Sequence, residues 1–273
     1  MPGLRLTLQA VPPERVDLSP LTPDRIAGRS RAEVAALPLA SGNRSLRVDA
    51  VFKLAGDPGP ELVIEGDGSR LDRIGEAMTQ GSIRLRGNAG AWLGVGMCGG
   101  TIEVEGSAGA YAGSGMQGGL LHVHQHAGDF LAAAAPGDHQ GMRGGVLVVS
   151  GNAGARAGDR MRRGTLIIDG DVGDCCASRM VAGTIAVGGA VGRNAGLAMR
   201  RGTLLLRRPP AALLPTFNDC GVQVVPILRL LARAWRGLPG PFASLSAGDL
   251  RARRSMGDLA NGGRGEILIL LPD

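Results

Sequence analysis

Apolar residues recur with a fixed period over most of this chain. The period is clearest at the methionines, which stand 19, 19, 26, 19, 19 and 19 residues apart at Met78, Met97, Met116, Met142, Met161, Met180 and Met199. Residues 82–100, SIRLRGNAGAWLGVGMCGG, and 101–119, TIEVEGSAGAYAGSGMQGG, show the repeat at its most regular. Self-similarity of this length is typical of solenoids, in which each repeat buries its apolar face against its neighbours.

Each repeat opens with a short segment in which apolar and polar residues alternate. One phase of the alternation is aliphatic throughout, at Leu62, Ile64, Ile83, Leu85, Ile102, Val104, Leu121, Val123, Leu147, Val149, Leu166, Ile168, Ile185, Val187, Leu204 and Leu206. A period of two indicates strands with one buried face. Because the same phase returns in every repeat, we expect one strand per repeat, stacked parallel and in register. The sequence therefore predicts a mainly β fold, a right-handed parallel β-helix of about 7–8 coils with 19-residue repeats. We expect right-handed coiling because the connections between parallel strands are almost always right-handed.

The two ends of the chain do not follow the repeat. We expect an N-terminal α/β cap at 1–60, a β-helix repeat domain at 61–221, and a C-terminal helix and strand extension at 222–273, since an uncovered solenoid end exposes unpaired backbone groups.

Local signals predict the elements of these two end regions. Leu4, Leu6 and Leu8 alternate as a first strand, Pro23 suits a helix start, and Ser30 with Glu33 forms a capping-box pattern. We also expect a strand at 46–54, an amphipathic helix at 227–236 that covers the last repeats, and a last strand at 266–271.

The outward-facing positions change character along the repeats. One column begins with Val63, Arg84, Glu103 and His122 and continues with Val148, Ile167, Ala186 and Leu205. The second half is too apolar to face water. A cover is therefore expected, either the helix at 227–236 or another subunit.

Arginine supplies almost all of the positive charge. The net charge is +6 and Lys53 is the only lysine, so bidentate contacts to carboxylates or phosphates are favoured. Several arginines gather next to the repeated methionines, at Arg143, Arg160, Arg162, Arg163, Arg179, Arg200 and Arg201. Equivalent positions of adjacent repeats lie about 5 Å apart, so these charges repel one another. Either an acidic ligand or subunit neutralises them, or they form an ordinary solvated face.

No other residues form a convincing catalytic or metal site. His122, His124 and His126 alternate as metal ligands would, but no carboxylate or cysteine completes the set at the usual spacing, so no metal is expected. Cys175 and Cys176 are interpreted as packing residues, and the four cysteines show no CxxC pair. The repeated glycines are corners rather than phosphate loops, because no helix follows them. We expect no catalytic residues in this chain.

The fourth repeat is seven residues longer than the others. The extra residues fall near 132–140, AAAAPGDHQ. Insertions into a repeat array form loops on one face, and both a partner contact and an inert surface loop are compatible with this one. The N-terminus has no signal-peptide pattern and no apolar run approaches the length of a membrane span, which predicts a cytoplasmic protein.

The chain resembles a known family in several segments. GNAGAWLGVGMCGG, GSAGAYAGSGM, HAGDFLAAAAPGDHQGMRGG and GNAGARAGDRMRRGTLIIDG resemble the C subunits of formylmethanofuran dehydrogenases, and most of all those of bacterial formyltransferase/hydrolase complexes. The C-terminal β-helix of glutamate synthase shares the glycine repeat. The departures are Gln125 and Ala177, which stand where the repeat has glycine, and the repeat from 203, which has lost its glycines.

The resemblance implies a noncatalytic structural subunit. In that bacterial complex, a formyltransferase-like subunit moves formyl from formyl-tetrahydromethanopterin to a methanofuran-type carrier, and an amidohydrolase-like subunit releases formate at a metal site. The carrier bears a glutamate-rich tail, so the resemblance suggests that Arg160, Arg162, Arg163, Arg200 and Arg201 guide a polyglutamate arm. The alternatives are the C subunit of a molybdenum or tungsten formylmethanofuran dehydrogenase and a free-standing glutamate synthase-type β-helix. No nucleic acid or membrane partner is expected.

Overall fold

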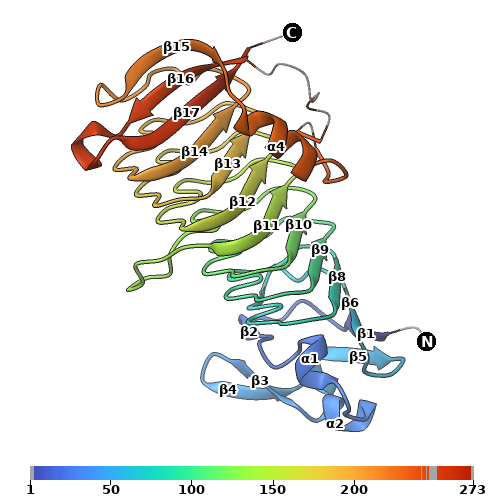
Figure 1. Cartoon of the computed structure of the whole chain (residues 1–273). Coiled ribbons are helices and arrows are strands. Elements are labelled where there is room, and N and C mark those ends of the chain that lie inside the picture. Colours follow the sequence, from blue (N-terminus) through green and yellow to red (C-terminus); the bar gives the residue numbers. More distant parts are fainter. Residues whose placement is uncertain (1–2, 241, 244, 246–250, 272–273) are drawn as a thin grey trace.

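The computed structural model is mainly β, as the sequence predicts. It describes residues 3–240, 242–243, 245 and 251–271, so the outermost residues of both expected end regions and part of the segment after the helix lie outside the described residues. Figure 1 shows an elongated stack, with the N-terminal elements at one end and the last strands of the chain at the other.

A continuous parallel sheet runs along the stack. Its strands in the repeats are β6 (Glu61–Glu65), β8 (Ser82–Arg86), β9 (Thr101–Val104), β10 (Leu120–Val123), β11 (Arg143–Val149), β12 (Arg163–Ile168), β13 (Thr184–Val187) and β14 (Arg201–Leu206). Each pairs parallel with the next, and the aliphatic positions face each other in register. All sixteen aliphatic side chains of the predicted phase are at most 1% exposed. One in-register strand per repeat is therefore confirmed.

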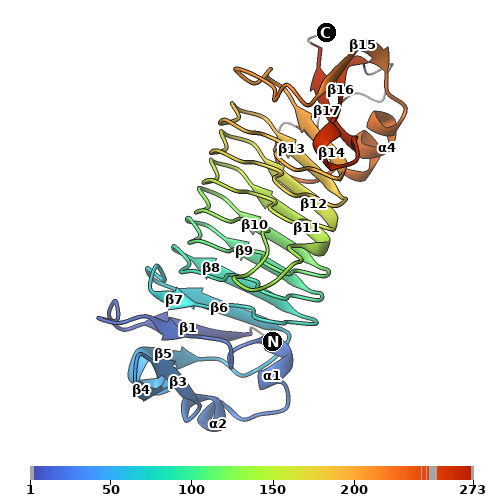
Figure 2. The ribbon, with the colours of Figure 1, turned by 90° about the vertical axis from the view of Figure 1, so that its left-hand side faces the viewer.

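A second, shorter ladder joins the repeats away from this sheet. It consists of single parallel bridges through Gly68, Ala89, Ala108, Ala127, Ala153, Val172 and Val191. Figure 2 shows the resulting layers, each lying directly on the one before. Equivalent side chains of successive layers are therefore held one strand spacing apart, about 4.8 Å.

The repeated methionines interlock with glycines of the next repeat. All seven methionines are fully buried. A Cβ atom added at any of six glycines would lie 2.6–3.1 Å from the Cε of the methionine in the repeat before, as in the pair of Gly100 and Met78; the six are Gly100, Gly119, Gly145, Gly164, Gly183 and Gly202. Each of these six glycines also has a positive φ, which other residues adopt only at a cost. The methionine and glycine columns thus pack against each other along the whole stack of repeats.

Aromatic side chains form another column. Trp92 and Tyr111 stack with ring centroids 4.2 Å apart, and Tyr111 and Phe130 stack at 4.8 Å. The guanidinium groups of Arg73 and Arg156 lie over the two ends of this stack. Cys175 falls in the same positive-φ column, two repeats beyond Phe130, and Cys176 is fully buried beside it. The packing role expected for Cys176 is confirmed.

The N-terminal region joins the first repeat through β1 (Leu4–Leu8), which pairs parallel with β6 and antiparallel with β5 (Phe52–Ala55). The other elements are β2 (Val16–Asp17), α1 (Pro23–Ile26), α2 (Arg31–Ala35), β3 (Pro38–Ser41), β4 (Arg44–Arg47) and α3 (Val48–Val51). Strand β2 also pairs parallel with β7 (Leu71–Asp72) of the first repeat. Helix α1 begins at the predicted proline, and the capping box of α2 is formed. Both predictions are confirmed.

The expected strand at 46–54 is wrong. The chain forms the end of β4, then the single turn α3, and only then β5. Val48 and Val51 are both buried. Because they are three residues apart, one helical turn brings them to the same side, whereas an extended strand would send them to opposite sides.

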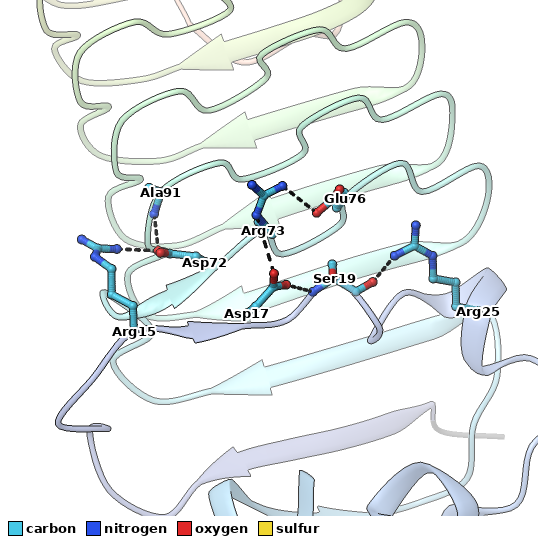
Figure 3. A network of polar contacts seen from close by, with 8 residues as sticks. All are labelled: Arg15, Asp17, Ser19, Arg25, Asp72, Arg73, Glu76 and Ala91. Carbon is cyan, nitrogen blue, oxygen red and sulfur yellow. Dashed lines mark hydrogen bonds and ion pairs between the residues drawn. The ribbon is translucent and has the colours of Figure 1, made fainter. Parts of the chain in front are cut away.

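Polar contacts fasten this N-terminal region to the first repeats (Figure 3). Asp72 accepts a hydrogen bond from the backbone N–H of Ala91 in the next repeat and pairs with Arg15. Asp17 accepts from the backbone N–H of Ser19 at 2.7 Å and lies 3.6 Å from the Arg73 guanidinium. These surface ion pairs add little stability individually, but together they fix how the two regions meet.

The C-terminal region adds strands that the sequence did not predict. It contains β15 (Asn218–Val224), α4 (Ile227–Ala234), β16 (Arg251–Gly257), a 3₁₀ turn (Leu259–Asn261) and β17 (Arg264–Leu270). Strand β17 continues the stack parallel to β14, with Gly265 lying on Met199 as the glycine of a further repeat would. Strands β16 and β15 then extend the sheet antiparallel. The predicted helix and last strand are confirmed, whereas β15 and β16 were missed.

The apolar outer column is covered by this region. Val148, Ile167, Ala186 and Leu205 are fully buried and pack in one cluster with residues of α4 and the segments around it. Leu228, Ala232 and Trp235 form the buried stripe at the helix, and Trp235 meets Phe242 edge to face. Full burial of a large aliphatic side chain stabilises a fold by about 1.5–3 kcal/mol. The helix is therefore the cover that the sequence called for. Among the described residues, no helix is long and apolar enough to cross a bilayer.

The interlocking of methionine and glycine can be tested at Gly164. Alanine there would meet the Cε of Met142 at 3.0 Å, at a φ of +94°. We expect Gly164→Ala to lower the free energy of unfolding by about 2–4 kcal/mol, the sum of backbone strain and overpacking. Chemical denaturation of both proteins measures the change.

Gly137 provides the matched control, because its φ is +86° but nothing lies within 4 Å of an added Cβ. Gly137→Ala should cost only the backbone term, about 1–2 kcal/mol. Equal losses in the two variants would show that the methionine contact contributes nothing.

Candidate functional site

Six exposed arginines gather on one side of the last repeats. They are Arg143, Arg162, Arg163, Arg200, Arg201 and Arg264, and we call them the arginine cluster. Together with Val181, Ala182, Asn261 and Gly262 they line an open hollow of about 670 Å³. The strand register places Arg143 beside Arg163 and Arg201 beside Arg264. The cluster is therefore set by the stacking of the repeats.

The hollow exists because one repeat lacks arginines. The two residues after the methionine are Arg162 and Arg163 in one repeat and Arg200 and Arg201 two repeats later, but the repeat between them has Val181 and Ala182. The short side chains of Val181 and Ala182 form the apolar base of the hollow, and the guanidinium groups of the repeats before and after lie on either side of it. This arrangement suits an elongated anion with an apolar stem.

No side chain that the structure describes neutralises the charges of the arginine cluster. Across the described residues, none of the six guanidinium groups has an ion pair or hydrogen bond with another side chain. Two unit charges about 5 Å apart repel by roughly 1 kcal/mol in water. A bound carboxylate or phosphate would remove this repulsion and gain charge-assisted hydrogen bonds.

Two of the arginines that the sequence grouped with the cluster lie elsewhere. Arg160 contacts the Asp138 carbonyl and the His139 Nδ1 of the insertion. Arg179 is paired with Asp159, whose side chain is 4% exposed. Both arginines line a second hollow of about 330 Å³, beside Tyr111 and Phe130. Arg160 therefore does not share a site with Arg162, Arg163, Arg200 and Arg201.

Arg264 is the member of the cluster that sequence reasoning missed. It lies 63 residues beyond Arg201 in the chain but is its direct neighbour in the sheet. A signal was present, because residues 264–268, RGEIL, match 201–205, RGTLL, in the arginine, the glycine and the aliphatic phase. The intervening helix and strands concealed it.

His122 and His124 lie side by side, with ring centroids 4.1 Å apart, as their alternation suggests, whereas His126 does not join them. One side-chain donor atom each of Glu103, His122 and His124 lies within 4.8 Å of the other two. His126 is not part of this group, because its Nδ1 accepts from the backbone N–H of Asn152. The missing carboxylate thus comes from the preceding strand. Burial, followed by the neighbouring His124, lowers the pKa of His122, which keeps this imidazole neutral at pH 7.

The carboxylates of Asp159 and Asp174 are both occupied in contacts within the fold. Asp159 accepts hydrogen bonds from Ser178 and Arg179, and Asp174 accepts from the backbone and side chain of Arg193. Neither carboxylate faces the other across a cleft. Pairs of carboxylates that cleave glycosidic bonds must flank a common space, so these two do not form such a site.

The repeat region matches a known family model. A family model described as "GXGXG motif" matches residues 72–229, more than half of the chain. The chain belongs to the GXGXG motif family. That stretch begins in the first repeat and ends in α4, so it includes five of the six residues of the arginine cluster.

Two relatives resemble this GXGXG chain in sequence. The C subunit of the formyltransferase/hydrolase complex Fhc of Methylorubrum extorquens is 45% identical over 85 residues, 31% of this chain and 32% of that protein. The C subunit of the tungsten-containing formylmethanofuran dehydrogenase 2 of Methanothermobacter wolfeii is 35% identical over 101 residues, 35% of this chain and 37% of that protein. The aligned segments thus span about a third of these relatives.

The likeness in three dimensions extends much further. A chain in the crystal structure of the formyltransferase/hydrolase complex FhcABCD from Methylorubrum extorquens, solved with methylofuran, has a TM-score of 0.92 to this GXGXG chain. The two are 44% identical, and the match covers 98% of this chain and all of the other. Both flanking regions are therefore included in the likeness.

Asp169 is a half-buried acid at the edge of the α4 cover. It follows β12 directly, and its Oδ1 is buried without a hydrogen-bond partner among the residues that the structure describes. The backbone of Gly240 packs against the carboxylate, since a Cβ there would lie 2.3 Å from either oxygen. Burial raises the pKa of Asp169 to about 6. The charged form is therefore disfavoured in the folded protein.

The pKa of Asp169 predicts how stability changes with pH. Because the folded value lies above the unfolded value, the contribution is present below about pH 4 and is lost as pH rises through about 6. We expect Asp169→Asn to stabilise the protein at pH 8 by about 1–2 kcal/mol, after allowing for solvent access, but hardly at about pH 3.5, where the carboxyl is protonated in both the folded and the unfolded chain. Thermal denaturation at both values measures this, with exposed Asp57→Asn as the control. A gain that is equal at both pH values would contradict the prediction.

Proposed function

We propose that this chain is a noncatalytic structural subunit of a complex that transfers formyl from formyl-tetrahydromethanopterin to a methanofuran-type carrier and hydrolyses it to formate. The observation that carries this proposal is the likeness, over 98% of the chain, to a chain of the formyltransferase/hydrolase complex. The contacts of Asp159 and Asp174 support it too, because both carboxylates bind groups of adjacent repeats.

The architecture behind this role is a right-handed parallel β-helix of about 7–8 coils with 19-residue repeats. An N-terminal α/β cap at 1–60, a repeat domain at 61–221 and a C-terminal extension at 222–273 complete it. The in-register parallel strands and the ladder of single bridges support the helix. The α4 cover supports the assignment of the C-terminal part. A rod closed at both ends is suited to holding other subunits along its sides.

The partners in this proposal are a formyltransferase-like and an amidohydrolase-like subunit in the cytoplasm. The complex would use a methanofuran-type carrier, tetrahydromethanopterin and a metal in the hydrolase subunit. The M. extorquens structure contains methylofuran, a carrier of this type. The alternative is the C subunit of a molybdenum or tungsten formylmethanofuran dehydrogenase. A C subunit of such a dehydrogenase is 35% identical to this chain, whereas the C subunit of the hydrolase complex is 45% identical. A free-standing glutamate synthase-type β-helix is a further alternative, which rests on the glycine repeat alone.

Affinity purification from the native cells tests the complex directly. With this chain as bait under gentle conditions, we expect formyltransferase-like and amidohydrolase-like subunits in a fixed ratio, identified by mass spectrometry. Molybdopterin and iron–sulfur subunits would instead support the dehydrogenase. Recovery of the chain alone and monodisperse would contradict both.

Within this complex we propose that the arginine cluster guides the glutamate-rich tail of the carrier. Arg162, Arg163, Arg200 and Arg201 keep the role suggested by the resemblance, Arg143 and Arg264 join them, and Arg160 is left out because it lies in the other hollow. Unpaired guanidinium groups in register match a chain of carboxylates, and Val181 and Ala182 give its methylene groups an apolar floor.

Charge reversal tests this guidance in the assembled complex. We expect Arg162→Glu with Arg201→Glu to raise the KM for a long-tailed carrier about tenfold and to leave kcat unchanged, because the contacts are equal in ground and transition states. For a carrier without the glutamate tail, the KM of the variant complex should equal that of the unchanged complex.

The control for this variant is Arg44→Glu with Arg208→Glu, which makes the same change of charge at exposed residues outside the cluster. An intact complex whose KM for the long-tailed carrier is unchanged in the cluster variant would sink the proposal. The role as a structural subunit would stand in that case, since co-purification tests it separately.

A further inference from the structure

A group of metal-binding side chains lies on the outer face of the sheet, on strands β9 and β10. His122 and His124 are separated by one residue on β10 and just beyond its end, so both rings project from the same face. Glu103 on β9 is the direct register partner of His122. One carboxylate and two imidazoles therefore converge from two adjacent strands.

The distances within this group are close to those of a metal centre. The donor atoms lie within 4.8 Å of one another, and the His124 Nε2 is 3.0 Å from the Glu103 Oε1. Two donors bound tetrahedrally at the usual zinc distances are about 3.3 Å apart. The side chains of Glu103 and His124 are 35% and 41% exposed, so small χ rotations are open to them. Side-chain rotation can therefore bring these atoms closer to the separations of a metal centre.

Neighbouring groups orient the donors. The His122 Nε2 is 3.0 Å from the Ser150 Oγ. This contact occupies one ring nitrogen and leaves the other nitrogen as the metal ligand. The second oxygen of Glu103 is held by the Arg84 Nε at 3.2 Å. Partners of this kind fix ring tautomer and carboxylate orientation in metal sites. Arg84 also places a positive charge beside the group, which limits the affinity for a cation.

We propose that Glu103, His122 and His124 form a site for a divalent transition-metal ion of the zinc class. Two imidazoles and one carboxylate suit Zn²⁺, and three protein ligands leave a position open for water. The site is separate from the arginine cluster and lies where the exposed charged half of the outer column meets the half covered by α4. It does not depend on the proposed role in formyl transfer.

Calorimetric titration of the full chain with Zn²⁺ tests the site. The exposed Cys98 and Cys220 are soft ligands that compete for zinc, so the titration uses the Cys98→Ser, Cys220→Ser protein as background. We expect one Zn²⁺ per chain. Glu103→Gln, His122→Gln and His124→Gln should each weaken binding by at least about tenfold, the loss that even outer-sphere partners cause. The Co²⁺ absorption spectrum should show the same losses and reports coordination independently of heat.

His126→Gln is the matched control, because His126 follows the same strand but lies outside the donor group. Its affinity for Zn²⁺ should equal that of the background protein, and circular dichroism should be alike in all variants. Absence of stoichiometric binding in the background protein would overturn the proposal. So would folded ligand variants that bind Zn²⁺ as tightly as the control.

Discussion

The close approach of backbone to backbone between successive repeats is the constraint on which this structure depends. Positive-φ glycines let each corner lie against the corner before it, and the methionine methyl groups fill the space that remains. A side chain at these glycines would push two layers apart. The period of 19 residues follows, because every repeat must return to the same position on its neighbour.

This constraint makes columns, rather than single residues, the units of the surface. Strand spacing of about 4.8 Å stacks whatever the repeats carry at one position: aliphatic residues in the interior, three parallel aromatic rings at one corner, and arginines at another. A change within a column then creates a site. Val181 and Ala182 interrupt the arginines and open a hollow, and histidines succeed a glutamate to give a group of metal-binding donors.

The sequence predicts the features that repeat, and it fails where a contact joins distant segments. The aliphatic phase, the buried methionines and the cover at α4 could all be read from periodicity. Strand β16 could not, because its inward residues include Ala252 and Ser255, which give no hydrophobic alternation. Arg264 was missed because β17 joins the stack out of chain order. The outer column already placed Glu103 beside His122, but Glu103 was not counted as a ligand because spacing along the chain is a poor guide to ligands that come from adjacent layers.

The central claim is that this chain organises formyl transfer and hydrolysis without performing either reaction. Reconstitution from separately purified subunits tests it most directly: formate release from the formylated carrier is measured with this chain alone, with its partners alone and with all of them together. The account predicts no turnover by the chain alone, and full assembly and turnover only when it is added to its partners. Formate release by the isolated chain, lost on mutation of one of its own acids, would contradict the account.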